Sequence, residues 1–283
     1  SFLHNSPFFA SAPTSGSWRE SRGLSRTRPH SSALGGLQPL ILGHKGAPQV
    51  APENTLASLR VALELGADGV EFDVRPCRSG ELVVIHDESV DRTTNGRGRV
   101  SSLSLSQLKA LDAGSWFHPR FEGERIPTLE VALEVASSAS LIDIELKVDV
   151  RRRRAHIGRR ALGIVAERGL LDRVLFSSFD PFVLWHLRHL DPRVRTGLLL
   201  APRRQAAWMR AWRMGETSFD VLCPHHQMLN PEFVGRARAN GYGLLVWTIS
   251  EPAEMRRLAQ LGIDGLITDR PDLALRVLRE EAS

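Results

Sequence analysis

Short apolar runs alternate with longer amphipathic stretches along the chain from Leu37 onward. The short runs are rich in Leu, Val and Ile, whereas the longer stretches repeat apolar residues at helical spacing. This alternation predicts βα units around a parallel sheet. The expected strands span residues 40–43, 69–74, 82–85, 141–146, 174–176, 195–200, 221–223, 244–249 and 265–268. Helices are expected over 54–65, 161–168, 181–190, 231–239 and 253–261.

One of these strands cannot lie parallel to the strand before it. Between Val74 and Leu82 the chain is too short for the crossover of about a dozen residues that parallel neighbours need. Ser79-Gly80 instead predicts a two-residue hairpin turn, which places Asp73 opposite His86. Without the returning hairpin strand, eight βα units remain, and they predict an α/β fold, the TIM (β/α)8 barrel.

Residues 1–36 follow neither period. They are rich in Ser, Gly, Pro and Arg, and such a segment buries too little apolar surface to offset its chain entropy. We therefore expect disorder over 1–36 and a folded domain over 37–283. The Arg- and Ser-rich, acid-poor composition is also typical of organellar transit peptides, so a leader without a role and a targeting segment both stay open.

Composition and charge narrow the class of protein. The chain is 42% hydrophobic and 24% charged, which excludes a disordered or collagen-like chain. Residues 1–36 supply +3 of the net charge of +5. The one basic run in the rest, Arg151–Arg154, opens a predicted helix and is more simply a solvated face, so we expect no nucleic-acid partner. Neither a secretory signal nor a run long enough to span a membrane is evident, which favours a cytoplasmic protein without an integral membrane segment.

Several predicted barrel strands end in polar residues where a core would need apolar ones. Barrel enzymes place their chemistry at the carboxyl ends of the strands, so these residues are candidates for an active site. Residues two apart share one face of a strand, which groups Glu71 with Asp73, and Asp143 with Glu145 and Lys147. The candidates at strand ends are His44, Lys45, Glu71, Asp73, His86, Asp143, Glu145, Lys147 and Trp247.

The residue types in this set suggest one kind of chemistry. Carboxylates from two strands form the all-oxygen site that a hard divalent cation, Mg²⁺ or Ca²⁺, prefers. Two histidines beside such a site suit a general base and a general acid, and lysines there favour an anionic substrate such as a phosphate. Each residue alone could be a structural ion pair or a buried histidine; their convergence on one rim favours function.

Eight motifs, in order over about residues 40–275, resemble the glycerophosphodiester phosphodiesterase family. Any one of them alone would be a weak signal, whereas the ordered series is specific. They are Gly43-His44-Lys45-Gly46-Ala47, Ala51-Pro52-Glu53-Asn54-Thr55, Gly66–Asp73, Glu81–Asp87, Asp91–Gly96, Ile144-Glu145-Leu146-Lys147, Val246-Trp247-Thr248 and Gly265–Pro271.

The resemblance implies a TIM barrel with a small insertion after the second barrel strand, here at about residues 88–127. It also implies hydrolysis of small glycerophosphodiesters to glycerol 3-phosphate and an alcohol, with a divalent cation as cofactor. Glu71, Asp73 and Glu145 match the family's metal ligands.

The same resemblance implies roles for the remaining candidates. His44 and His86 would be the acid–base pair, and Lys45 and Lys147 would bind the phosphate. Trp247 would form an apolar wall against the glycerol, with core packing as the alternative. The family usually has arginine where this chain has Lys45, and a lysine keeps the positive charge but loses the bidentate fork.

Two alternatives to this function remain. A lysophospholipase D-type phosphodiesterase on the same barrel would need an apolar groove for an acyl chain. A non-catalytic ligand-binding barrel is the other, and the retention of both histidines and all three acids argues against it. The headgroup, the metal, the order of the two histidines and the oligomeric state stay open.

Overall fold

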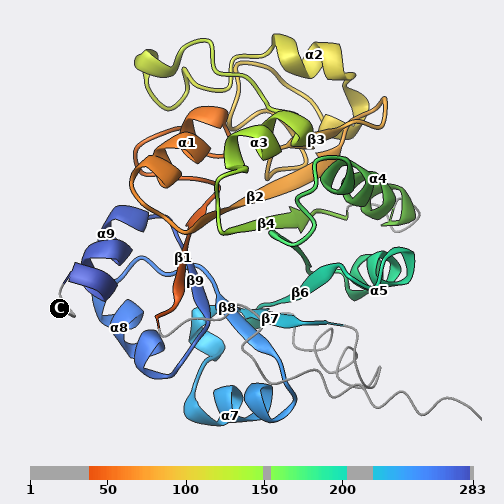
Figure 1. Ribbon diagram of the computed structural model, residues 1–283. Coiled ribbons are helices and arrows are strands. Elements are labelled where there is room, and N and C mark those ends of the chain that lie inside the picture. The colour runs from red at the N-terminus through yellow and green to blue at the C-terminus, as the bar shows by residue number, and fades with distance from the viewer. Residues whose placement is uncertain (1–37, 149–153, 203–218, 281–283) are drawn as a thin grey trace, which may run out of the picture. The chain divides into compact units, whose positions relative to one another are not determined.

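Eight parallel strands close into a barrel in the computed structural model, which describes residues 38–148, 154–202 and 219–280 (Figure 1). The strand β1 pairs with β2 on one side and with β9 on the other, which closes the ring. The predicted TIM barrel is therefore confirmed. Its strands are β1 (Leu40–His44), β2 (Gly69–Pro76), β4 (Leu141–Leu146), β5 (Val174–Ser178), β6 (Arg195–Leu200), β7 (Val221–Pro224), β8 (Gly243–Val246) and β9 (Gly265–Thr268).

Helices cover the outside of the barrel (Figure 1). Thr55 and Asp180 begin two of them, because their side chains accept the N–H groups of Ser58 and Phe182. The helices are α1 (Leu56–Glu64), α2 (Leu105–Ala110), α3 (Leu129–Ala136), α4 (Arg154–Glu167), α5 (Pro181–Leu190), α7 (Pro231–Ala239), α8 (Pro252–Gln260) and α9 (Pro271–Leu275). Short 3₁₀ turns span Val100–Ser102, Pro119–Phe121 and His226–Met228, and a π-helical turn spans Arg276–Glu280.

The inward-facing residues of the barrel change from apolar to polar along the strands. Leu42, Leu141, Leu175 and Leu245 lie on β1, β4, β5 and β8 and belong to one buried apolar cluster. On β4 the next residues of the same face are Asp143 and then Glu145, so the carboxylates follow the apolar layer toward the carboxyl end. The core thus ends where the pocket begins.

The strand β3 (Leu82–Val84) is antiparallel to β2, as predicted, but the predicted turn is wrong. Pro76 pairs with Leu82, and Gly80 donates its N–H to the carbonyl of Cys77, so the loop has one residue more than expected. Gly80, at a φ of 95°, supplies the left-handed residue that a three-residue loop needs. The register therefore shifts by one, and Asp73 accepts the N–H of Ile85 rather than facing His86.

Residues 88–127, between β3 and α3, pack around their own apolar cluster. Val90, Val100, Leu108 and Ile126 are buried there together with residues of the β2–β3 hairpin. In Figure 1 this segment carries α2 and lies beside β3 and α3. The division between residues 1–36 and the barrel stays a prediction, because residues 1–37 lie outside the described part of the chain.

None of the helices in the described ranges has both the length and the apolar character needed to cross a membrane.

Candidate active site

A pocket of about 550 Å³, its open mouth included, lies at the carboxyl ends of the barrel strands. Eight of the nine candidates predicted from the sequence line this pocket. The ninth, Asp73, is the partner of Glu145 in the register of β2 and β4. The lining residues are His44, Lys45, Glu71, His86, Asp143, Glu145, Lys147, Ser177, Phe179, Leu199, Trp247, Thr248 and Ile267.

Three carboxylates from β2 and β4 form the centre of the site. Asp73 pairs with Glu145 in the register of the two strands, and Glu71 lies two residues before Asp73 on the same face. One oxygen from each of the three lies within 4.8 Å of the others, and all three residues are buried. Burial, with the negative charge of Asp73 and Glu145, raises the pKa of Glu71 well above its usual range. Such a buried oxygen set fits a hard divalent cation.

Lys147 contacts two of these three carboxylates. Its Nζ lies 2.9 Å from Oδ1 of Asp73 and 2.6 Å from Oε1 of Glu145. Burial opposes ionisation of Asp73, yet the charge of Lys147 holds the pKa of that carboxyl below its usual range. The lysine predicted to bind phosphate therefore also compensates the carboxylate cluster.

Asn54 holds Asp73 from the side away from Lys147. Its Nδ2 donates to Oδ2 of Asp73 at 2.9 Å, and its Oδ1 accepts the backbone N–H of Asp73 at 3.2 Å. Asn54 itself has a left-handed backbone, with a φ of 59°, which asparagine tolerates better than most residues. Both oxygens of Asp73 thus have a fixed neighbour.

His44, the last residue of β1, lies between two acids. Its Nδ1 is 2.6 Å from Oδ1 of Asp269, and its Nε2 is 3.9 Å from Oε2 of Glu71. Asp269 directly follows β9, which is the neighbour of β1 in the ring. A carboxylate on Nδ1 orients the ring and leaves Nε2 for the pocket.

His86, which follows β3, has the same kind of partner. Its Nδ1 is 2.7 Å from Oδ1 of Asp87. Arg92 donates two hydrogen bonds to Asp87, and these hold the pKa of the Asp87 carboxyl below its usual range. Burial, aided by the charges of Lys147 and Lys45, lowers the pKa of His86. The imidazole is therefore neutral near pH 7.

Lys45 has a strained backbone and two contacts to acids. Its φ is 52°, in the left-handed region, and its N–H donates to Oε2 of Glu71 at 3.0 Å. Its Nζ donates to Oε1 of Glu53 at 3.2 Å and is therefore an ion-pair partner of a carboxylate at the rim. The proposed contact of Lys45 with phosphate stays a prediction.

Apolar side chains form the opposite wall of the pocket. Trp247 donates its Nε1–H to the carbonyl of Cys223 at 2.7 Å, and its ring meets Phe179 edge to face at 5.7 Å. Leu199 and Ile267 continue this wall. The indole is thus fixed in orientation, and the pocket has one charged and one apolar side.

Asp143 lies at the floor, one step below Glu145 on β4. It is fully buried, and neither of its carboxylate oxygens forms a hydrogen bond within the described residues. Burial raises the pKa of Asp143 to about 7, and the nearby Ser177 hydroxyl opposes the rise without forming a bond of normal geometry. Near pH 7 this carboxyl is therefore partly protonated and carries only part of a negative charge.

Four residues of the site have contacts that the sequence did not predict. Asp269, Asp87, Asn54 and Arg92 all lie inside the family-like motifs, but no spacing pattern indicates their partners. The position of Asp269 directly after the last barrel strand is a usable signal, because a closed ring places it beside the end of the first.

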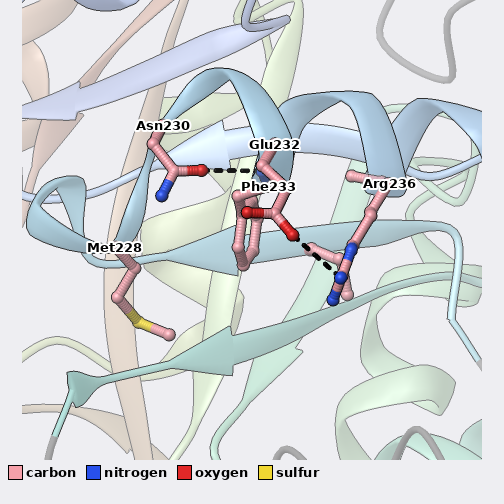
Figure 2. Close-up of a pocket in the computed structure, with 7 residues that line it drawn as sticks. Met228, Asn230, Glu232, Phe233 and Arg236 are labelled. Carbon is pink, nitrogen blue, oxygen red and sulfur yellow. Dashed lines mark hydrogen bonds and ion pairs between the residues drawn. The ribbon is translucent and has the colours of Figure 1, made fainter.

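A second cavity lies beside α7 and has no comparable chemistry (Figure 2). In Figure 2 Asn230 accepts the N–H of Phe233 at the start of α7, and Glu232 pairs with Arg236 one turn later. These polar groups stabilise the helix itself, and Met228 and Phe233 supply apolar surface. The pocket at the strand ends is therefore the better candidate for function.

Comparison with known proteins gives consistent matches. Residues 44–273 match the sequence model of the glycerophosphoryl diester phosphodiesterase family. The chain is 38% identical over 245 residues to the glycerophosphodiester phosphodiesterase of Caldanaerobacter subterraneus subsp. tengcongensis, which covers 86% of this chain and 99% of the relative. A glycerophosphodiester phosphodiesterase of Bacillus subtilis is 32% identical over 254 residues and covers 84% and 86% of the two chains.

Solved structures give the same result. A phosphodiesterase of Oleispira antarctica, in complex with the product sn-glycerol-3-phosphate, is similar with a TM-score of 0.77 and 31% identity, over 85% of this chain and 96% of that one. The glycerophosphodiester phosphodiesterase of Agrobacterium tumefaciens is similar with a TM-score of 0.70 and 31% identity, over 83% and 98% of the two chains.

Proposed function

Because the chain belongs to the glycerophosphoryl diester phosphodiesterase family, and is thereby a phosphoric diester hydrolase, we propose that it cleaves small glycerophosphodiesters to glycerol 3-phosphate and an alcohol. The observation that carries this proposal is the pocket itself, which combines three clustered carboxylates with two histidines whose Nδ1 atoms each contact an aspartate. The Oleispira antarctica structure, whose product is sn-glycerol-3-phosphate, supports the same product here.

We assign the cation to the three carboxylates of Glu71, Asp73 and Glu145. Their oxygens suit Mg²⁺ or Ca²⁺. The pKa of Glu71 is raised because burial and the neighbouring carboxylates oppose its ionisation, and a cation among the three would relieve this repulsion. When bound, the ion would neutralise phosphate charge and orient the substrate. Asn54 keeps Asp73 in one orientation, which fixes the position of the ligand oxygens.

The two histidines act as the acid–base pair. The lowered pKa of His86 keeps its imidazole neutral near pH 7, so this ring suits the acceptance of a proton from the attacking hydroxyl or water. His44, with Nδ1 held by Asp269, then protonates the oxygen of the departing alcohol. Lys45 and Lys147 supply positive charge beside the phosphate, and Trp247 faces the apolar part of the glycerol.

A lysophospholipid is the second candidate substrate. The wall formed by Phe179, Leu199, Trp247 and Ile267 is apolar and supports contact with a short hydrophobic group. Among the described residues this apolar wall consists of four side chains, which suit a short apolar contact rather than a full acyl chain, so the small substrate is preferred. We expect the protein to work without an integral membrane segment.

Metal removal tests the proposal most directly. Exhaustive dialysis against chelator should abolish release of glycerol 3-phosphate from glycerophosphocholine or glycerophosphoethanolamine, and Mg²⁺ or Ca²⁺ should restore it. Glu145→Gln should lower the affinity for the metal by at least roughly tenfold, as measured by calorimetry. Glu88→Gln, at an exposed carboxylate paired with Arg99, is the matched control and should bind metal normally.

Full activity in excess chelator would refute the assignment of the three ligands. Faster turnover of lysophosphatidylcholine than of glycerophosphocholine would instead favour the lysophospholipase D-type alternative on the same barrel.

A further inference from the structure

Arg92 lies at the centre of a chain of ion pairs that runs along the rim of the pocket. Its Nη1 and Nη2 each donate to Glu53 at 2.8 Å, and its Nε and Nη2 donate to Asp87 at 2.7 and 3.1 Å. One guanidinium thus forms a forked pair with two carboxylates at once, a geometry that lysine cannot reproduce.

Each carboxylate that Arg92 holds has a second partner inside the pocket. Oδ1 of Asp87 meets Nδ1 of His86 at 2.7 Å, and Oε1 of Glu53 accepts from Nζ of Lys45 at 3.2 Å. The contacts therefore connect a proposed acid–base residue with a proposed phosphate-binding residue through one arginine.

The segment that carries Arg92 is braced by its own hydrogen bonds. Val90 donates its N–H to the carbonyl of Gly98, and the hydroxyl of Thr94 donates to the carbonyl of Val90. Gly98 in turn donates to the side chain of Asp91, and Val90 is buried in the local apolar cluster. The backbone on both sides of Arg92 is thus fixed relative to β3.

We propose that Arg92 is a positioning residue, through which the segment 88–127 holds the ring of His86 and the ammonium of Lys45 in their working orientations. The inference rests on the function proposed above. Without the guanidinium, Asp87 can turn away from His86, and Glu53 pairs with Lys45 alone and draws its charge away from the phosphate. A misplacement of this kind lowers the rate although no group touching substrate is removed.

The effect should separate into two kinetic parameters. Arg92→Met should lower kcat/KM for glycerophosphocholine at saturating Mg²⁺ by roughly 10–100-fold. The part of the loss that acts through His86 should lower kcat, and the part that acts through Lys45 should raise KM. Arg92→Lys should recover part of this loss, because an ammonium can pair with one of the two carboxylates. Arg99→Met is the matched control: this arginine pairs with Glu88 on the same segment, 2.7 Å away at the surface, and its loss should leave both parameters unchanged.

Double-mutant cycles distinguish positioning from a general effect on the fold. In a His86→Ala background, Arg92→Met should lower kcat by less than about threefold, because the ring it orients is gone. In a Lys45→Ala background its effect on KM should disappear in the same way. Losses of equal size in the wild-type and variant backgrounds, or wild-type kinetics of Arg92→Met itself, would overturn the proposal.

If Arg92→Met unfolds at the assay temperature, the same double-mutant cycles are measured with Arg92→Lys and Arg92→Gln below their melting temperatures.

One further result separates this proposal from the proposed function. A His86→Ala enzyme with wild-type kcat would refute the acid–base pair and with it the kcat branch, and the KM cycle with Lys45→Ala would then decide the remaining branch.

Discussion

The β1–β9 side of the pocket and the β3 side each present a histidine whose Nδ1 lies against an aspartate, at 2.6 Å for His44 and 2.7 Å for His86. The two aspartates are held by different means. Asp269 directly follows β9, which pairs with β1 in the closed ring. The adjacent Arg270 pairs with Asp272 rather than with Asp269. Asp87 lies in a loop outside the ring.

Support on the β3 side comes from charge rather than from strands. Arg92 holds the Asp87 carboxylate by hydrogen bonds and compensates part of its negative charge. Asp269 contacts His44 from the end of β9, the strand that pairs with β1. The side chain of Arg92 is 47% exposed, so solvent and salt weaken its ion pairs. One histidine–aspartate pair is thus held by barrel strands and the other by ion pairs, and the two pairs should respond differently to substitution.

Removal of either imidazole should have the largest effect. His44→Ala and His86→Ala should each lower kcat by roughly 10²–10⁴, because each removes a proton-transfer group. Melting temperatures should change little, since both side chains are partly exposed at the rim. His189→Ala, on the outer face of α5, is the control for loss of an exposed histidine. A wild-type kcat in either rim variant would show that this histidine is structural.

Substitution of the aspartates should separate the two sides. Asp269→Asn should lower kcat by roughly 10²-fold, because His44 loses the full negative charge of the carboxylate that orients its ring at Nδ1. Asp87→Asn should lower it by only about tenfold, since Arg92 already neutralises part of that charge. Steady-state kinetics at saturating metal measure both, with Asp272→Asn as the neighbouring control. A larger loss for Asp87→Asn would reverse the comparison.

Lys45→Ala should lower the rate less than removal of either imidazole does, and it should also change the pH dependence. Loss of one charge-assisted contact should lower kcat/KM by roughly 10–100-fold. The Lys45 charge lowers the pKa of His86, so its removal lets the imidazole keep its proton to higher pH. The acidic limb of the pH–kcat profile, which lies below pH 6.5 if His86 is the base, should therefore move upward.

Lys45→Arg is the control for this prediction, because it keeps the positive charge and should retain most activity and the wild-type limb. An unchanged kcat/KM and an unmoved limb in Lys45→Ala would remove Lys45 from the site and leave it as a partner of Glu53 alone.

The sequence predicted the barrel and the residues that gather at its mouth for one physical reason. Alternation along a strand decides which residues face inward, and the carboxyl ends of parallel strands share one edge. Glu71 and Asp73 therefore meet Glu145 in the structure as their spacing indicated.

Contacts that depend on exact register or on distant loops could not be predicted in this way. The hairpin turn is one residue longer than expected, because Gly80 adopts the left-handed conformation of a three-residue loop. The contact of His44 with Asp269 spans 225 residues and exists only in a closed ring. Arg92 lies in a segment without periodicity, where no pattern indicates the direction of a side chain.

The pairing of the first barrel strand with the last also has a consequence for the growing polypeptide. During synthesis residues 40–86, from the start of β1 to just beyond β3, leave the ribosome long before β9, and they include both histidines and two of the carboxylates. The partner of His44 arrives only with Asp269, and the ring cannot seal until β9 lies between β8 and β1. We therefore expect no turnover from a nascent chain until β9 has docked, so that the first turnover would report the closing of the ring.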